Sequence, residues 1–298
     1  MKRNTILAIT IFLLPVVLSL GWCALTYQVA PHGTTLKVMT YNIHEGVGVN
    51  NRLDLDAILA TIQAWDPDVV VLQEVDMGVV LTGWVDQAQW LSLRLNMYLA
   101  TVSDAESMWQ GDVILSKYPF WYFESILLPS AEETDTLLKA TISVNSQAVT
   151  IFCVHFTVMS PESRLEQANI AFPYIDAVSG LKIWAGDFNI DAYTTNATDQ
   201  GILASILTRF NDTFDIVPSG NRYGNCTSPS WDPTERIDYI FVSNGIAVNE
   251  HRVPASLASD HLPVVATLQV PSSALAPTHR MTVEGAMTLE PIGKKYSV

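Results

Sequence analysis

The sequence predicts an α/β fold in which two packed, mixed β-sheets are covered by helices. The chain contains roughly ten or more short apolar segments of the length and β-branched content expected for strands. Amphipathic helical segments separate some of these strands but not others. This mixed order favours two packed sheets over a doubly wound parallel sheet, in which strands and helices alternate regularly.

The strands are predicted from short apolar runs bounded by turn residues. They are residues 36–43, 68–72, 113–116, 122–127, 136–144, 148–156, 181–185, 237–242, 246–253 and 263–270. Residues 68–72 form a continuous Val-rich run, which is typical of a strand buried on both faces.

The helices are predicted from apolar residues at helical spacing. They are residues 53–65, 85–95, 162–177 and 201–210. In the first of them Leu55, Ile58, Leu59 and Ile62 share one face, and Asp54 is suited to cap its start. The third follows the pair Ser160-Pro161, which is typical of a helix start.

The amino-acid composition limits the size of the core and the kinds of partner that this domain can bind. The chain has 298 residues, of which 49% are hydrophobic, so residues 36–270 can bury a sizeable core as a single domain. Its 16 basic and 30 acidic residues give a net charge of -14. Proteins that track a phosphate backbone usually present a basic face, so this balance disfavours a long polyanion without excluding a local basic groove. Three cysteines show no zinc or redox spacing.

The N-terminus, residues 1–28, has the pattern of an export signal or membrane anchor. Lys2 and Arg3 precede an uncharged apolar run from Ile6 to Leu25. The run is close to the length that spans a bilayer, and the basic residues would stay in the cytoplasm. A cleaved signal peptide is the alternative, but residues 21–30 offer no convincing cleavage site. We therefore expect a domain outside the cytoplasm, either anchored or secreted, and a C-terminal tail at residues 271–298.

Polar residues that can do chemistry recur at the ends of apolar strands. They are Asn42, Glu74, His155, Asp187, Asn189, Asp238, Asp260 and His261. Each alone has an ordinary explanation: an Asx turn for Asp187 and Asn189, or a satisfied core histidine for His155. Together they offer hard oxygen ligands for Mg²⁺ or Mn²⁺ and groups that move protons.

The motifs Gly186-Asp187-Phe188-Asn189 and Ser259-Asp260-His261-Leu262-Pro263, preceded by Tyr41-Asn42 and Gln73-Glu74-Val75-Asp76, resemble the endonuclease/exonuclease/phosphatase superfamily. This superfamily includes pancreatic deoxyribonuclease, apurinic-site endonucleases, neutral sphingomyelinases and inositol-polyphosphate phosphatases. The resemblance runs from Leu36 to Leu268 and implies a four-layer α/β sandwich with its active site at one end of the two sheets.

The resemblance also implies a role for each residue at the metal and the phosphate. Glu74 would be the main metal ligand, with Asn42 beside it, and Asp260 would reach the Mg²⁺ or Mn²⁺ directly or through water. Asp187 and Asn189 would hold the attacking water or the phosphate.

The two histidines and Asp238 would handle protons and charge. His261 would transfer protons, oriented by Asp238, and His155 would donate a hydrogen bond to a phosphoryl oxygen. Either Asp187 or His261 would take the proton of the water.

Two further comparisons refine this expectation. Several nucleases of the superfamily carry an acidic residue two positions after the asparagine, where this chain has His44 followed by Glu45. An imidazole suits Mg²⁺ less well than a carboxylate, so a second metal contact there is disfavoured. Residues 39–43, 115–119 and 127–130 are similar to the phosphodiesterase-like domain of eukaryotic proteins that remodel GPI-anchor lipids.

Three functions follow from these observations. The first is a metal-dependent phosphodiesterase or phosphatase acting outside the cytoplasm on a phospholipid or phosphorylated glycolipid. The second is an extracytoplasmic endonuclease or exonuclease, which a basic groove near the site would favour. The third is a non-catalytic binding domain. A domain that has lost catalysis would be expected to lack at least one of Glu74, Asp187, Asn189 and His261, and all four are present.

Overall fold

The computed structural model describes residues 35–103, 109–216 and 225–271. These residues belong to one compact unit, His32–Val298, which is distinct from the unit Met1–Pro31. The expected leader at residues 1–28 and the expected tail from residue 272 onward lie outside the described ranges. Within those ranges, no helix combines the length and the apolar character needed to cross a lipid bilayer.

The first sheet has the strand order β11-β12-β1-β2-β4-β3. Its strands are β1 (Thr35–Asn42), β2 (Val69–Asp76), β3 (Tyr98–Ser103), β4 (Gln110–Ser116), β11 (Ala247–Arg252) and β12 (Val264–Gln269). The central strand β1 pairs in parallel with β2 and antiparallel with β12, so the sheet is mixed. The sheet therefore joins the first and last strands of the domain.

The second sheet has the strand order β5-β6-β7-β8-β10-β9. Its strands are β5 (Phe120–Pro129), β6 (Thr134–Val144), β7 (Gln147–His155), β8 (Leu181–Asp187), β9 (Asn211–Asp212) and β10 (Asp238–Val242). Here β7 and β8 are parallel and the other pairs are antiparallel.

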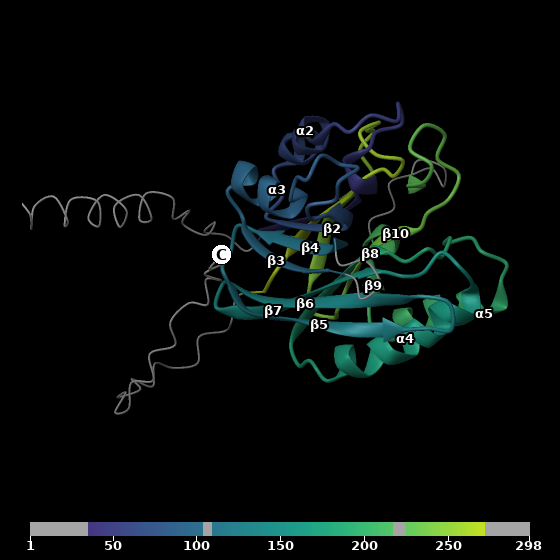
Figure 1. Ribbon diagram of the computed structural model, residues 1–298. Helices are drawn as coiled ribbons and strands as arrows, with labels where there is room; N and C mark the ends of the chain where they lie inside the picture. Colours follow the sequence, from purple (N-terminus) through teal and green to yellow (C-terminus); the bar gives the residue numbers. More distant parts are fainter. Residues whose placement is uncertain (1–34, 104–108, 217–224, 272–298) are drawn as a thin grey trace, which may run out of the picture. The chain divides into compact units, whose positions relative to one another are not determined.

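Helices cover the outer face of each sheet (Figure 1). On the first sheet lie α2 (Leu55–Trp65) and α3 (Gln87–Leu95), and on the second lie α4 (Pro161–Asp176) and α5 (Ala197–Leu207). Ile58 and Ile62 of α2 pack on buried residues of β1 and β2, while Phe172 of α4 packs on Trp184 of β8. Burial of these apolar faces holds the four layers together. The predicted sandwich of two mixed sheets flanked by helices is confirmed.

The two sheets contact each other through apolar side chains and through polar bridges, one of which lies in the core. Gln73 of β2 donates a hydrogen bond from Nε2 to Sγ of Cys153 on β7, at 3.4 Å, and accepts one from Thr40. All three side chains are buried. This bridge fixes the distance between the two sheets at Gln73, the residue that precedes Glu74.

The strand directions bring the predicted site residues to one end of the sandwich. Asn42 is paired with Gln73, and Asp187 is paired with both His155 and Asp238. We call this end the site end. At the opposite end, the far end, Thr35 pairs with Gln269, so the first and last strands of the domain begin and finish away from the site.

Several elements were not predicted from the sequence. One is the edge strand β3, in which only Ala100 among residues 98–101 is buried. The short helices η1 (His44–Gly46) and α6 (Thr213–Ile216) were also not predicted. Helix α5 begins at Ala197 rather than at residue 201, because the Asn196 side chain caps it by accepting from the backbone N–H groups of Thr198 and Asp199.

His251 on β11 gives a prediction for stability. It is buried, Nδ1 shares a 2.9 Å hydrogen bond with Thr213, and Nε2 has no hydrogen-bond partner among the described residues. Burial, helped by Arg236 and Arg252, lowers the pKa of His251 to about 4. The unfolded chain, with an ordinary histidine pKa of about 6.5, takes up this proton first, so the folded state loses stability as the pH falls from about 6.5 to 4.

We expect the free energy of unfolding, relative to that of His251→Gln, to fall by about 2–3 kcal/mol between pH 7 and pH 4.5. Urea unfolding of both proteins at the two pH values measures this difference. The variant serves as the reference because other groups, such as Asp215, have a raised pKa and act in the opposite direction. Parallel pH profiles of the two proteins would show that His251 titrates normally in the folded state.

Candidate active site

Asn42 and Glu74 are placed by the neighbouring strands β1 and β2. The Asn42 side chain is buried; its Nδ2 donates to Glu74 Oε1 at 2.8 Å and to Asp187 Oδ2 at 3.1 Å. Its Oδ1 accepts from the backbone N–H of His44 at 3.0 Å. One amide thus holds two carboxylates together, one from each sheet.

Glu74 lies in a β-bulge. The pairing of β2 with β4 shifts by one residue between Leu72 and Val75, and Glu74 has a φ of 54°. Bulges re-aim side chains next to active sites, and a non-glycine residue at positive φ is held there only by its surroundings. The bulge turns the Glu74 carboxylate out of the sheet and into the site, and nothing in the local sequence marks it.

Asp187 is the last residue of β8, and Asn189 follows it in a tight turn. Asp187 Oδ1 accepts from the backbone N–H of Asn189 at 2.9 Å, which is the Asx turn expected from the sequence. Asn189 also donates from Nδ2 to the carbonyl oxygen of Phe156 at 2.7 Å. The preceding Gly186 is required, because a Cβ there would lie 1.9 Å from the carbonyl oxygen of Val154. Asp187 is buried, and burial together with Asp238 raises its pKa.

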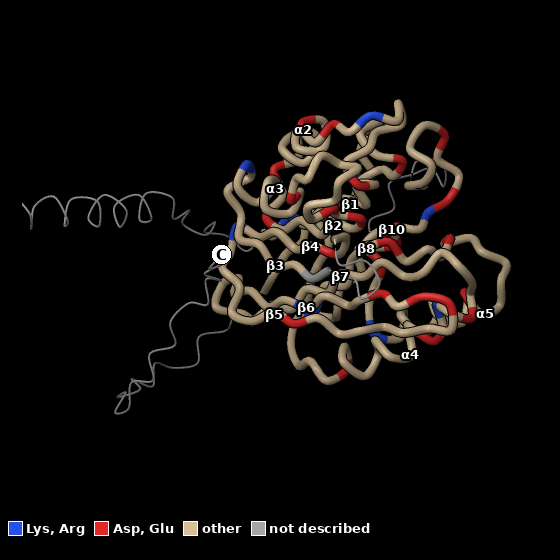
Figure 2. The backbone as a smooth tube through the Cα atoms, viewed as in Figure 1, with Lys and Arg blue, Asp and Glu red and all other residues tan. Residues whose placement is uncertain are grey.

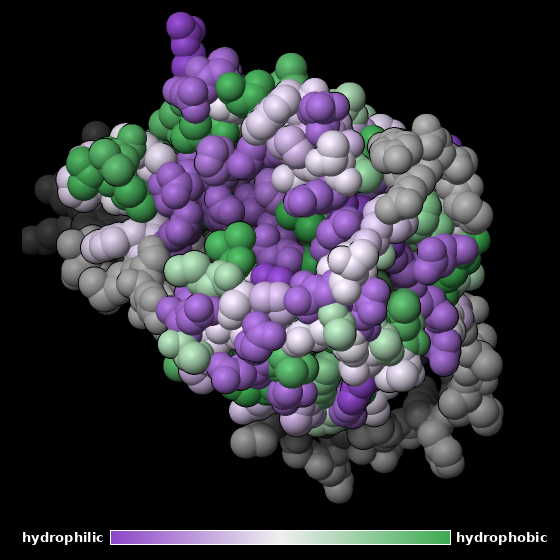
Figure 3. All heavy atoms as spheres, turned by 90° about the vertical axis from the view of Figure 1, so that its right-hand side faces the viewer, coloured by the Kyte–Doolittle hydropathy of each residue, from purple (hydrophilic) through white to green (hydrophobic). Residues whose placement is uncertain are grey.

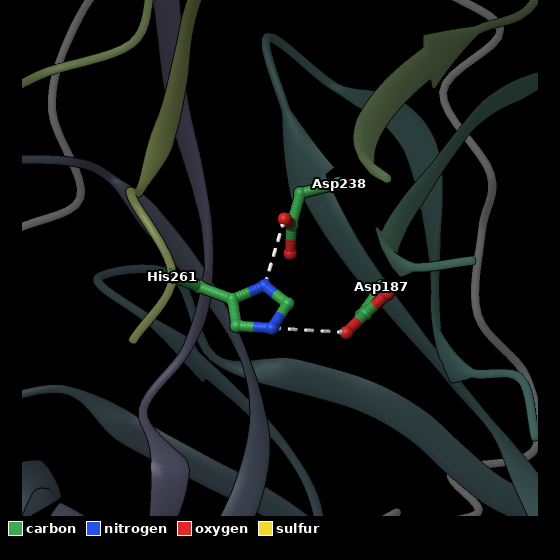
Figure 4. A group of neighbouring side chains, drawn as sticks. All are labelled: Asp187, Asp238 and His261. Atoms are coloured by element: carbon green, nitrogen blue, oxygen red, sulfur yellow. Dashed lines mark hydrogen bonds and ion pairs between the residues drawn. The ribbon is translucent and has the colours of Figure 1, made fainter. Parts of the chain in front are cut away.

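His261 is held by two carboxylates of the second sheet (Figure 4). Its Nδ1 lies 2.9 Å from Asp238 Oδ2, and its Nε2 lies 3.7 Å from Asp187 Oδ2. Burial lowers the pKa of His261, but Asp238, Asp187 and Asp260 outweigh that effect and raise it to about 10. Because Nδ1–H donates to Asp238, Nε2 is the nitrogen left to exchange a proton with a reacting group.

His155 ends β7 between two carboxylates. Its Nε2 lies 3.9 Å from Glu74 Oε1 and 3.7 Å from Asp187 Oδ2. Burial lowers its pKa, and the carboxylates, Asp187 and Glu74 foremost, overcome this and raise it to about 9. A cationic imidazole in this position can donate a hydrogen bond to an anionic oxygen that enters the site.

Asp260 lies on another side of the site. Its Oδ1 is 3.7 Å from His44 Nδ1 and 3.3 Å from Ser259 Oγ, and that hydroxyl donates to the carbonyl oxygen of Asn42 at 2.7 Å. The contacts described for Asp260 thus tie it to the segment after β1, and none of them joins it to Glu74. His44 Nδ1 also lies 3.1 Å from the carbonyl oxygen of Val47, so this nitrogen is engaged with the backbone.

A cavity of about 200 Å³ opens beside Glu74 and His155. Sequence analysis missed three carboxylates that line it, Glu45, Glu133 and Asp135. Each is held by a neutral donor: Gln110 Nε2 for Glu45, Thr157 Oγ1 for Glu133 and Gln167 Nε2 for Asp135. Glu133 directly precedes β6 and Asp135 is its second residue, and this acidic start of a strand is indistinguishable in sequence from a solvated loop.

The charge of this end is mostly negative. Among the described residues no Lys or Arg lines the cavity, and Figure 2 shows acidic residues gathered around the ends of β2, β7 and β8. Figure 3 turns the right-hand side of Figure 1 towards the viewer and shows a hydrophilic hollow at its centre with hydrophobic groups at its edge.

The donor set fits a divalent cation. Glu74, Asp187 and Asp260 offer carboxylate oxygens and Asn42 an amide, which are the hard ligands that Mg²⁺ and Mn²⁺ prefer. Two of these carboxylates converge on one amide, and the part of the cavity lining that the structure describes holds no Lys or Arg, an arrangement that a cation would stabilise. Ligand atoms of Asp187, Asp238 and His261 also lie within 4.8 Å of one another. Within this group Asp238 is already engaged with His261 through the 2.9 Å hydrogen bond to Nδ1.

Comparisons with known proteins agree with this geometry. Residues 39–261 match the model of the Endonuclease/Exonuclease/phosphatase family. No curated protein matches the chain. Among solved structures, the endonuclease/exonuclease/phosphatase from Beutenbergia cavernae DSM 12333 is 26% identical, with a TM-score of 0.66 over 79% of this chain and 72% of that chain.

Two other structures are similar in fold. The mannosyl-6-phosphatase Bt3783 from Bacteroides thetaiotaomicron VPI-5482 is 19% identical, with a TM-score of 0.62 over 78% of this chain and 99% of that chain. TDP2 from D. rerio, complexed with a single-strand DNA product, is 18% identical, with a TM-score of 0.64 over 78% of this chain and 98% of that chain.

Proposed function

We propose, from the premise that this chain belongs to the endonuclease/exonuclease/phosphatase family, that it is a divalent-metal-dependent hydrolase of phosphoric esters. The observation that best supports the proposal is that these side chains converge at one end of the two sheets. There the Asn42 amide holds Glu74 and Asp187, and the Asp238 carboxylate holds His261. These groups come from strands far apart in the sequence, which chance packing does not readily assemble.

The cation would be held by Glu74 and Asn42, with Asp260 reaching it directly or through water. A Mg²⁺ or Mn²⁺ ion bound there supplies Lewis-acid chemistry, polarising a phosphoryl oxygen and stabilising charge on the leaving oxygen.

The other residues would orient the reactants and move protons. Asp187 and Asn189 hold the attacking water or the phosphate. His155 donates to a phosphoryl oxygen as charge develops on it, and that hydrogen bond strengthens in the transition state. His261, held in one tautomer by Asp238, transfers a proton through Nε2, and either His261 or Asp187 accepts the proton of the water.

A phospholipid or phosphorylated glycolipid outside the cytoplasm is the substrate class we propose. The apolar segment Ile6–Leu25 supports a membrane location, and the net charge of -14 disfavours a polyanion. The cavity supports the same choice, since its described lining contains four carboxylates and neither Lys nor Arg. An extracytoplasmic nuclease is the runner-up, and no basic groove in the described residues favours it.

The test is hydrolysis by the full chain in detergent. A soluble aryl phosphodiester is offered with Mg²⁺, with Mn²⁺ and with excess chelator, followed by sphingomyelin, phosphoinositides and plasmid DNA. We expect turnover that requires the metal and a preference for a lipid over DNA. Turnover that survives exhaustive chelation, or no turnover of any of these substrates by folded, metal-loaded protein, would contradict the proposal.

The acidic cavity gives a further prediction. Asp135→Asn removes one charge and keeps an oxygen for Gln167, so we expect plasmid nicking at low salt to rise by up to about tenfold. High salt should abolish the difference, because it screens the repulsion. Asp56→Asn, on the outer surface of α2, is the control that also removes one carboxylate. Equal nicking by Asp135→Asn and the control would mean that the cavity charge does not exclude nucleic acid.

A further inference from the structure

Large apolar side chains are exposed on four separate loops around the mouth of the site. They are Leu81, Trp84, Trp109, Val158, Met159 and Trp231, which we call the apolar rim. Leu81 is 93% exposed and Trp84 69% exposed. Scattered exposed apolar residues are ordinary on a protein surface, but a set gathered around one functional opening marks an interaction surface.

Contacts in the structure tie each loop of the rim to the site. Val158 itself lines the cavity, and Trp109 precedes Gln110, which lines it too. Trp231 follows Ser230, whose backbone N–H donates to the carbonyl oxygen of Asp260. The topology agrees, since β2, β4, β7 and β10 all have their adjoining ends at the site end.

The loop that presents Leu81 and Trp84 is firmly built. Thr82 is buried and donates from Oγ1 to Asp76 Oδ2 at 2.6 Å, two residues after Glu74. The backbone N–H of Trp84 donates to the carbonyl oxygen of Val79 at 2.8 Å. The buried Thr82 fixes the shape of the loop, and in this shape the side chain of Leu81 is exposed to solvent. The exposure is therefore a property of the fold.

The composition of the rim favours a lipid surface as its occupant. Tryptophan is enriched where an apolar phase meets water, and three of the six rim residues are tryptophans. The rim surrounds an acidic cavity, so a nucleic acid or an anionic bilayer would be repelled at its centre. The side chains come singly from several loops around a polar hollow, and a fluid headgroup layer can accommodate that arrangement.

We propose that the apolar rim inserts into the headgroup region of a zwitterionic lipid bilayer, so that the acidic cavity opens onto the membrane surface. This inference rests on the proposed function only in taking the lipid as substrate. The contact with the bilayer is a separate property and can be measured without turnover.

The test places a nitroxide on the rim of the full chain. Leu81→Cys is labelled in a Cys23→Ser background, since Cys153 and Cys226 are buried, and the protein is reconstituted in phosphatidylcholine vesicles. Trp121→Cys is the matched control, because Trp121 is 63% exposed at the start of β5, at the far end. Collision rates with oxygen and with a water-soluble nickel chelate report the depth of each label.

We expect the label at position 81 to lie about 5–10 Å within the interface and the label at position 121 to stay in water. Equal exposure of both labels to the nickel chelate would overturn the proposal. Protection at position 81 that persists in detergent and grows with protein concentration would also overturn it, in favour of a second copy of the chain.

A second pair of measurements separates this proposal from the proposed function. Leu81→Asp should leave hydrolysis of the soluble aryl phosphodiester unchanged and slow hydrolysis of lipid in vesicles. Insertion of the rim without hydrolysis of any phosphoester would leave the rim proposal standing and contradict the proposed function. Hydrolysis of the soluble ester without insertion of the rim would support the proposed function and contradict the rim proposal.

Discussion

His261→Ala is expected to lower kcat for phosphodiester hydrolysis by about 10²–10⁴-fold, with little change in KM. The imidazole is held through Nδ1 by Asp238 at 2.9 Å, and its Nε2 faces Asp187. Such a group acts on proton transfer in the transition state and contributes little to binding of the ground state, so its loss should appear in kcat. Steady-state kinetics on the soluble aryl phosphodiester measure both constants.

Asp238→Asn tests the orientation of His261 without removing it. Its amide can present either an oxygen or a nitrogen to Nδ1, so the imidazole is no longer held in one tautomer, and we expect most of the activity to be lost. His251→Gln is the control for nonspecific damage to the fold, because His251 is also a buried histidine but has no part in the proposed site. More than a tenth of the wild-type kcat in His261→Ala would rule out His261 as the main proton-transfer group.

Glu74→Gln is expected to weaken divalent-cation binding by at least about 100-fold, because direct ligands should matter more than the outer-shell partners of a metal. Binding can be measured without activity. A ligand present at 100 times its dissociation constant stabilises the folded state by about 2.7 kcal/mol. Urea unfolding with and without Mg²⁺ should therefore show this stabilisation in the wild type and lose most of it in Glu74→Gln.

Glu133→Gln is the matched control for this experiment, since it removes a carboxylate from the same cavity without touching the predicted ligands. It should keep the Mg²⁺-dependent stabilisation. Loss of stabilisation in both variants would indicate that the cavity attracts cations by its total charge. If both variants kept the Mg²⁺-dependent stabilisation, Glu74 would not be a ligand of the cation.

The sequence predicted the fold, and it identified polar residues that the structure brings together at one end of the sheets, because both depend on strands. Apolar runs identify buried strands by their composition alone, and a polar residue that ends such a run, as Asn42, His155 and Asp187 do, stands out against it. Parallel neighbours bring their carboxyl ends together, which is why residues remote in the sequence meet in space. The assignment of Asp238 to His261 came from the family resemblance, and the structure places the two in direct contact.

The remainder depends on backbone conformation and on partners distant in the sequence. The bulge that turns Glu74 into the site is a single left-handed residue in an otherwise regular strand, and its sequence resembles that of any strand end. Glu133 and Asp135 line the cavity only because β6 begins beside His155. Their sequence context, the acidic start of a strand, is equally typical of a surface loop.

The hydrogen bonds at the site also cross from one sheet to the other. Asn42 and His261 belong to the first sheet and its connections, whereas their partners Asp187 and Asp238 belong to the second. Neither sheet alone holds a complete proton-transfer pair or both carboxylates. Any loosening that lets the sheets slide by even an ångström separates both pairs at once, so hydrolysis should cease before either sheet unfolds. Activity would then report the docking of the two halves of the domain.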